Sequence, residues 1–359
     1  MVHFPSVLDH SRRIPLVAEG VAGTDPRVSW LDPGIGEWWI DPSLCYYDRS
    51  FPVPPAADDW NPLNRQGRRP TSGAGGIGVG KWVLVPEGEG LRSMFFFGNG
   101  PDSPTTPMMQ YFATLDGTPW ADPHSTLLPG QLAQLWRLDP RMTVRLVLNN
   151  RTPEHGRFEW AVYAPSTDGK VFACTSWDAA TPDRHNLQVF RKHLGSVYNR
   201  DGLGAPEAVV TRGGAPARLR DDDPLFGTWL IDESRSSFLR AGQDIADSRP
   251  AVIARQKLVF RRNGDWVSGT TFATPGSDEP NTRSSWRFDA IEYPEDETGD
   301  RTATWWMIDP QTIIRRGRVG GVTREWSLHA LSEDKAMLAV TSWDQDRPYD
   351  RDIEVFRKV

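Results

Sequence analysis

Hydrophobic and polar residues alternate with a period of two along much of this chain. Between residues 158 and 163, Phe, Trp and Val alternate with Glu, Ala and Tyr, and a similar alternation returns at residues 325–329. A period of two predicts half-buried β-strands. Only Gln131–Arg137 is also compatible with one or two helical turns. Short strands with turns between them are typical of antiparallel sandwiches and barrels, so we predict an all-β protein.

Turn residues divide these runs into hairpins. Lys257–Phe260 is followed by Asn-Gly-Asp at 263–265 and then by Trp266 and Val267. A turn of this type between two apolar runs predicts a β-hairpin. Lys81–Val85, followed by the turn residues of 86–90, is its counterpart nearer the N-terminus.

The chain contains the same pattern twice. Residues 159–192 align with 325–358 at a constant offset of 166, so that TSWD recurs at 175 and 341 and VFRK at 189 and 355. Each copy opens on a related G-x-W segment, at Gly36 and at Gly227. We therefore predict two tandem antiparallel β-barrels that arose by internal duplication.

The repeat sets the domain boundaries. We assign 1–195 to an N-terminal barrel, 196–225 to a linker rich in Gly, Ala, Pro and charge, and 226–359 to a C-terminal barrel. The first copy is longer because of two segments, Pro52–Gly80 and Asn99–Gly130. The second of these carries apolar side chains among turn formers, which suits either a cover over a barrel mouth or packing against the other domain.

Composition and charge exclude several classes of protein. A net charge of −6 argues against nucleic-acid binding, which needs clustered Lys and Arg. No apolar run is long enough to span a membrane, and the first residues lack the apolar core of a signal peptide. Two cysteines cannot form a disulfide framework. We expect a cytoplasmic protein without a membrane partner, and a homodimer is left open.

The sequence supports neither a cofactor site nor a catalytic nucleophile of a familiar type. Residues 73–78 fit G-x-G-x-x-G, but neither a strand before them nor a helix after them is predicted, so we reject a dinucleotide site. The seven histidines show no metal-ligand spacing, and G-x-S-x-G is absent. We expect no metal and no cofactor.

The opening segments resemble the lipocalin, or calycin, signature. In that family a Gly-x-Trp strand begins an antiparallel barrel, the Trp closes its floor, and a late Arg lies across the Trp. The resemblance implies that Arg191 stacks on Trp38 and Arg357 on Trp229. GTWLIDESRSSF at 227–238 is similar to small bacterial lipocalin-like domains, whereas GEWWIDPSLCYY at 36–47 lacks the basic residue of that pattern. Tandem lipocalin-like barrels include carotenoid hydratases and natural-product cyclases.

Polar positions that differ between the copies are the best functional candidates. Tyr163 in the first copy is His329 in the second, and each shares a strand face with a glutamate, Glu159 or Glu325. If this face lines the barrel, each glutamate beside Tyr or His is an acid/base pair, because an apolar barrel favours the neutral carboxylic acid. If Trp160 and Trp326 face inward instead, these four residues lie in solvent.

Sixteen tryptophans suit a pocket for a flat or apolar ligand. We expect the following side chains to contact that ligand: Tyr111, Trp120, His124, Trp136 and Trp306. The favoured function is a cofactor-independent, non-redox enzyme, a lyase, hydratase, isomerase or cyclase, acting on an apolar polycyclic or aromatic small molecule. The alternative is a carrier that binds such a molecule without chemistry, and a purely structural module is the third reading.

Overall fold

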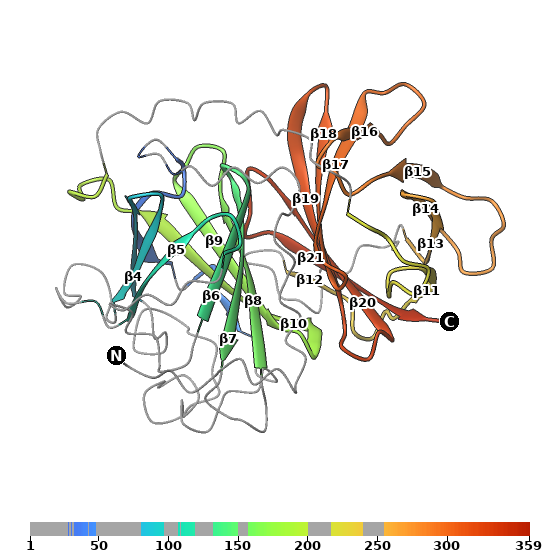
Figure 1. Ribbon diagram of the computed structural model, residues 1–359, viewed down its shortest axis with the longest axis horizontal. Helices are drawn as coiled ribbons and strands as arrows, with labels where there is room; N and C mark the ends of the chain where they lie inside the picture. Colours follow the sequence, from blue (N-terminus) through green and yellow to red (C-terminus); the bar gives the residue numbers. More distant parts are fainter. Residues whose placement is uncertain are drawn as a thin grey trace. The chain divides into compact units, whose positions relative to one another are not determined.

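The computed structural model describes residues 28, 30, 32–41, 43–47, 80–96, 107, 109–118, 132–149, 157–199, 217–239 and 255–359. Within these ranges all the regular secondary structure is β-strand, and the strands form two antiparallel sheets (Figure 1). The chain divides into two compact units, one for each sheet. The prediction of two antiparallel β-barrel domains is confirmed.

The first sheet runs from blue to green in Figure 1. Its strands are β1 (Gly36–Ile40), β2 (Tyr46–Tyr47), β3 (Lys81–Glu87), β4 (Gly90–Phe96), β5 (Met109–Thr114), β6 (Leu132–Asp139), β7 (Met142–Asn149), β8 (Arg157–Pro165), β9 (Val171–Asp178) and β10 (Thr181–Lys192). Their order is β5-β4-β3-β1-β10-β9-β8-β7-β6, with β2 beside β10. Past the end of β5, the Gly117 amide donates to the Leu135 carbonyl at 2.7 Å and the Arg137 amide to the Leu115 carbonyl at 3.0 Å. These bonds join the two edges of the sheet into a barrel.

The second sheet repeats this path in yellow to red (Figure 1). Its strands are β11 (Gly227–Ile231), β12 (Ser237–Leu239), β13 (Lys257–Asn263), β14 (Trp266–Phe272), β15 (Thr282–Trp286), β16 (Glu292–Pro294), β17 (Arg301–Asp309), β18 (Thr312–Val319), β19 (Val322–Leu331), β20 (Met337–Asp344) and β21 (Arg351–Lys358). Their order is β15-β14-β13-β11-β21-β20-β19-β18-β17-β16, with β12 beside β21. The barrel is nearly closed, because a stack of Trp286 on Trp305, with ring centroids 4.1 Å apart, crosses the seam from β15 to β17.

Two local predictions have clear outcomes. The hairpin is confirmed, since β13 and β14 pair up to Asn263 opposite Trp266, with Gly264 at a φ of 63° in the turn. A helical turn at 131–137 is wrong, because Leu132–Asp139 is strand β6. Ala133 and Leu135 belong to the first barrel's core, and apolar residues on both faces hid the strand period.

The interior of each barrel is defined by apolar side chains that converge from strands all around the sheet. In the second barrel they include Trp229, Leu258, Val267, Trp305, Ile313, Val340 and Phe356. In the first they include Trp38, Trp82, Phe95, Tyr111, Leu135, Tyr163 and Phe190. We call these sides the inner faces. The opposite faces also carry buried tryptophans, such as Trp160 and Trp326.

The G-x-W segments close one end of each barrel. The Trp229 indole is fully buried and donates to the Leu225 carbonyl at 2.9 Å, and that of Trp38 donates to the Gly34 carbonyl at 3.0 Å. Gly227 has a φ of 139°, in a region that side chains rarely adopt, and a Cβ there would lie 2.8 Å from Lys358 Cε. The backbone conformation favours glycine at the start of this strand, and any side chain there would also displace the end of Lys358.

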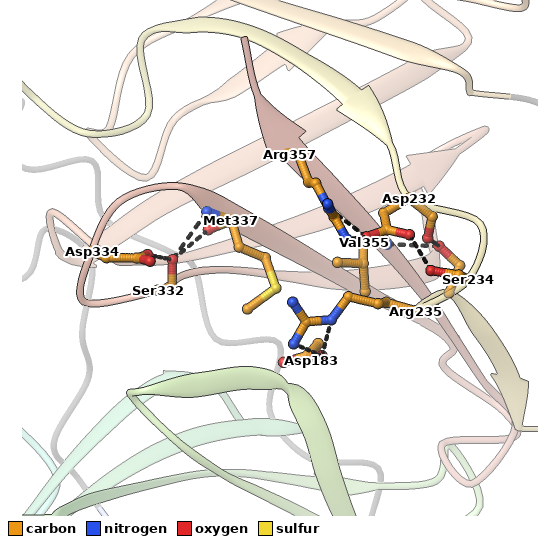
Figure 2. A network of polar contacts seen from close by, with 10 residues as sticks. Asp183, Asp232, Ser234, Arg235, Ser332, Asp334, Met337, Val355 and Arg357 are labelled. Carbon is orange, nitrogen blue, oxygen red and sulfur yellow. Dashed lines mark hydrogen bonds and ion pairs between the residues drawn. The ribbon is translucent and has the colours of Figure 1, made fainter.

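The expected stacking of an arginine on each opening Trp is wrong, because the next residue along the strand, a lysine, takes that place. Lys192 lies opposite Trp38, and Lys358 opposite Trp229, with each ammonium 5.1 Å from the indole centroid. Alternation along a strand sends the neighbouring arginine to the other face. There Arg357 donates to Asp232 at 2.6 Å, which also accepts from Ser234, as Figure 2 shows.

Several predictions concern parts of the chain that the structure leaves undescribed. Almost all of Pro52–Gly80, most of Asn99–Gly130 and 200–216 of the predicted linker lie outside the described residues. The described strands of the two sheets end at Lys192 and resume at Gly227. No helix in the described ranges is long and apolar enough to cross a membrane.

Candidate functional site

Tyr163 and His329 lie on the inner faces of their barrels. Tyr163 is a member of the first barrel's core, and it is 3 % exposed. His329 stands between Ile313 and Val340, both members of the second core, and is 4 % exposed. The Glu/Tyr/His face is therefore the inward one, which sequence alternation alone left open.

The described members of the predicted acid/base pairs, Glu325 and His329, have separate polar contacts. Residues four apart on one strand are separated by about 13 Å along it. The Glu325 carboxylate accepts from Arg315 Nη1 at 2.7 Å, whereas the polar contact of His329 is Ser327, whose Oγ lies 3.4 Å from Nε2. Glu159 is in β8 opposite Asp178, but its side chain is outside the described residues.

Two neighbouring cross-strand rows form a polar layer inside the second barrel. One row crosses β17 to β21 as Trp305, Arg315, Ser327, Ser342 and Asp352. The next holds Met307, Ile313, His329, Val340 and Glu354. Toward the floor the inner face becomes apolar, with Leu331 and Phe356. Toward the other end the Glu325 side chain is 46 % exposed, so the polar layer lies between the open end and the apolar floor.

Arg315 joins two carboxylates at the open end. Its Nε donates to Glu295 Oε1 at 2.8 Å, a second bond reaches Glu295 Oε2, and Nη1 bonds Glu325. Although burial opposes a charge here, the hydrogen bonds and charges of the two glutamates raise the pKa of Arg315. Its guanidinium lies 5.9 Å from the centroid of Trp305. Arg315 is thus a fixed positive charge against an aromatic wall.

A second arginine enters from just before β13. Arg255 Nε donates to Glu354 Oε1 at 3.2 Å, and Nη2 also bonds this carboxylate. The Glu354 side chain is 9 % exposed and that of Arg255 is 31 % exposed. A buried carboxylate needs such a partner, since an uncompensated charge inside a protein costs several kcal/mol.

His329 is held in its neutral form. Burial, together with the positive charges of Arg255 and Arg315, lowers the pKa of His329 to about 3. Its ring lies 5.3 Å from Trp305. At neutral pH it is an imidazole with one N–H to donate, close to two guanidinium groups. Such a group cannot serve as a proton reservoir, but it can donate a hydrogen bond to an oxygen that gains negative charge.

The first barrel has the same framework with different chemistry. Leu135, Arg145, Ala161 and Ser176 form its counterpart of the row from Trp305 to Ser342. Arg145 lies over the Tyr163 ring at 5.6 Å, and the Tyr163 and Tyr111 hydroxyls are 3.4 Å apart. Burial raises the pKa of Tyr163 well above its ordinary value. This interior is largely aromatic, and Tyr163 stays un-ionised.

The predicted ligand residues are divided between two faces. Tyr111 lies on the inner face of the first barrel. Trp136 and Trp306 lie on the opposite faces, where they stack on Trp160 and Trp326 at 6.2 and 6.0 Å. Trp120 and His124 lie outside the described residues. Within the first barrel, Tyr111 and Trp136 therefore lie on different faces of the sheet.

Prediction from sequence missed most of the residues in and beside the polar layer: Arg255, Arg315, Glu295, Glu354, Ser327, Trp286 and Trp305. One signal was available, because Arg145 and Arg315 recur at the offset of 170 that relates β6 and β7 to β17 and β18. Across the described parts of the chain, no three His, Cys, Asp or Glu side chains are arranged to hold a metal ion.

Comparison with known proteins gives no family for this chain. No protein-family model matches it, and no curated protein matches it either. A solved protein of unknown function from the DUF3598 family of Nostoc punctiforme is 8 % identical, covers 93 % of this chain and all of its own, and superposes with a TM-score of 0.26. A double mutant of transferrin binding protein B from Haemophilus parasuis is 7 % identical over 75 % of this chain and 63 % of its own, with a TM-score of 0.17. Likenesses this weak assign neither a family nor a function.

Proposed function

We propose that the second barrel binds a flat, largely apolar molecule that carries a carbonyl oxygen, and that it catalyses a non-redox proton transfer on it without a cofactor. The observation that carries the proposal is the neutral His329 beside Arg315 and Arg255, above an aromatic wall. Trp286 and Trp305 would stack on the apolar body of the substrate. Reactions of this class include isomerisation, hydration, elimination and cyclisation.

The chemistry follows from where charge develops. Glu325, at the open end, takes a proton from the carbon next to the carbonyl group. The C–H electron pair becomes a C=C bond, and the carbonyl π pair moves onto the oxygen as an enolate. The His329 N–H and the guanidinium groups stabilise that oxygen, and hydrogen-bond donors fixed in advance in a dry site are effective in this role. In a substrate whose enolate is conjugated with a further C=C bond, return of the proton to the far end of that dienolate completes an isomerisation.

Deuterium exchange tests the proposal directly. With 2-tetralone as the probe in deuterated buffer, we expect the protein to accelerate deuterium incorporation next to the carbonyl, measured by mass spectrometry. His329→Phe keeps an uncharged ring of similar size but removes the donor, so exchange should fall about 100-fold. Glu325→Gln removes the base and should lower exchange by at least about 100-fold. Exchange at the buffer rate in the wild-type protein would refute the enzyme proposal.

A carrier is the second candidate. It is favoured by the pairing of Arg255 and Arg315 with carboxylates, which stabilises the site before any ligand arrives. Tryptophan quenching by 2-tetralone with no exchange above buffer would support the carrier.

We also infer that both barrels are lipocalin-like. Support comes from the fully buried Trp after a glycine on each opening strand, the cation over that Trp, and the up-and-down strand order.

A further inference from the structure

Two polar atoms inside the second barrel have no hydrogen-bond partner among the described residues. They are the indole Nε1 of Trp286 and the hydroxyl Oγ of Ser342, and both are shielded from solvent. A buried donor left without a partner costs roughly 1–3 kcal/mol, so such groups in a folded protein call for an explanation. Both side chains lie on the inner face, because Trp286 belongs to the second core and Ser342 follows Val340 by two residues in β20.

The two side chains come from strands on opposite sides of the barrel. Trp286 is in β15 and Ser342 in β20, which are five strands apart in either direction around the ten-stranded path. Both side chains adjoin the Trp305 row. Ser342 shares a cross-strand row with Trp305, and Trp286 stacks on Trp305 at 4.1 Å. A molecule lying along the Trp305 row would therefore meet one of them at each end.

Chemistry limits what such a molecule can be. The indole Nε1 only donates, so the group that it meets must be an acceptor. Ser342 can donate or accept, while the nearby His329, Arg255 and Arg315 add further donors. Three carboxylates in and beside this layer, those of Glu295, Glu325 and Glu354, already accept from the two arginines. The interior thus offers donors in excess, against aromatic walls.

We infer that Trp286 and Ser342 are the residues that orient the ligand, and that the ligand is a flat aromatic molecule with oxygen acceptors at two opposite ends. This inference rests on the proposed function and narrows its substrate class. The oxygen at the Trp286 end is a carbonyl or ether, and the oxygen at the Ser342 end is a carbonyl or hydroxyl. A ligand with a single polar end would leave one of the two atoms unpaired.

A matched pair of probes tests the acceptor requirement. Anthraquinone-2-sulfonate has two opposite carbonyl oxygens, and anthracene-2-sulfonate has the same frame and charge without them. We expect the wild-type protein to bind the quinone at least about tenfold more tightly, measured by calorimetry, because each of two hydrogen bonds is worth about fivefold. Equal binding of the two probes overturns the inference but leaves the binding proposal standing. Binding of neither probe overturns both.

Two variants test the residues themselves. Ser342→Ala should lower the quinone preference about fivefold while Tm stays the same or rises, because the lost hydroxyl had no partner in the protein. Ser176→Ala, the equivalent change in the first barrel, is the control and should alter neither value. Trp286→Phe should lower the preference similarly, whereas Trp306→Phe, which alters an unpartnered indole on the opposite face, should not. If Trp286→Phe does not fold, Ser342→Ala decides: an unchanged quinone preference in that variant refutes the inference.

Discussion

His329 lies close to two guanidinium groups, and this position determines how its charge responds to pH. In the unfolded chain its pKa is about 6.5, whereas in the folded protein it is about 3. Between these values the unfolded state binds the extra proton, so His329 makes the protein less stable as pH falls, by about 1.4 kcal/mol per pH unit. Neutral His329 contributes its full stabilisation only above pH 6.5.

A second group changes stability in the opposite direction. Burial raises the pKa of Asp309 to about 6, so between pH 6 and 3.8 the folded state binds the extra proton and stability rises as pH falls. The effect of His329 is therefore isolated by comparison with His329→Phe, in which Asp309 is unchanged. We predict that urea denaturation from pH 7 to 4.5 shows wild type losing stability relative to the variant. If the stabilities of the two proteins change in parallel with pH, His329 takes up its proton as readily in the folded protein as in the unfolded chain.

Individual residues also show which side-chain positions could be predicted from the sequence alone. Period-two alternation placed Glu325 and His329 on one face, and the structure agrees. It could not choose the inward face, because both faces of β19 are buried: Trp326 is 0 % exposed and His329 4 %. The sequence could not show that Lys358 lies over Trp229. Which residue lies opposite the Trp depends on the exact register of the two strands, and a family resemblance does not determine that register.

At the scale of the element, the opening strands depend on their first residue. Gly227 combines a φ of 139° with the end of the Lys358 side chain, which would have to shift to make room for a Cβ. We predict that Gly227→Ala lowers the free energy of unfolding by about 1–3 kcal/mol, through strain and displacement of Lys358. The measurement is urea denaturation of the intact protein.

Gly276→Ala is the matched control for that change. A Cβ at Gly276 meets no atom within 4 Å, and its backbone has no left-handed requirement. Replacing such a glycine lowers the entropy of the unfolded chain and leaves stability unchanged or up to about 1 kcal/mol higher. Equal losses in both variants would show that the opening strand has no special need for glycine.

At the scale of the whole molecule, duplication has produced two interiors with one framework. The repeated segments became the closing strands β8–β10 and β19–β21, as the offset of 166 predicted. The repeat could not predict Arg255 and Glu295, because both enter the polar layer from outside the aligned segments. Long-range placement of this kind has no local sequence signal.

The difference between the interiors predicts that the proton-transfer chemistry is confined to the second barrel. Tyr163→Phe removes a hydroxyl whose described contact is Tyr111, and it should cost about 0.5–1.5 kcal/mol of stability. Exchange of 2-tetralone should stay at the wild-type rate in this variant and fall only in His329→Phe. A loss of exchange in Tyr163→Phe would place chemistry in the first barrel as well.

The pair of Arg255 and Glu354 also constrains the order in which its two residues arose during evolution. The position equivalent to Glu354 in the first copy is Gln188, a neutral amide, at the offset of 166. A chain that acquired the glutamate first would have carried a buried carboxylate without its partner, at a cost of several kcal/mol. The arginine can reach water, since its side chain is 31 % exposed, and so it could arise alone. From an ancestor like the first copy, the mutational path open to a stable protein is arginine before glutamate.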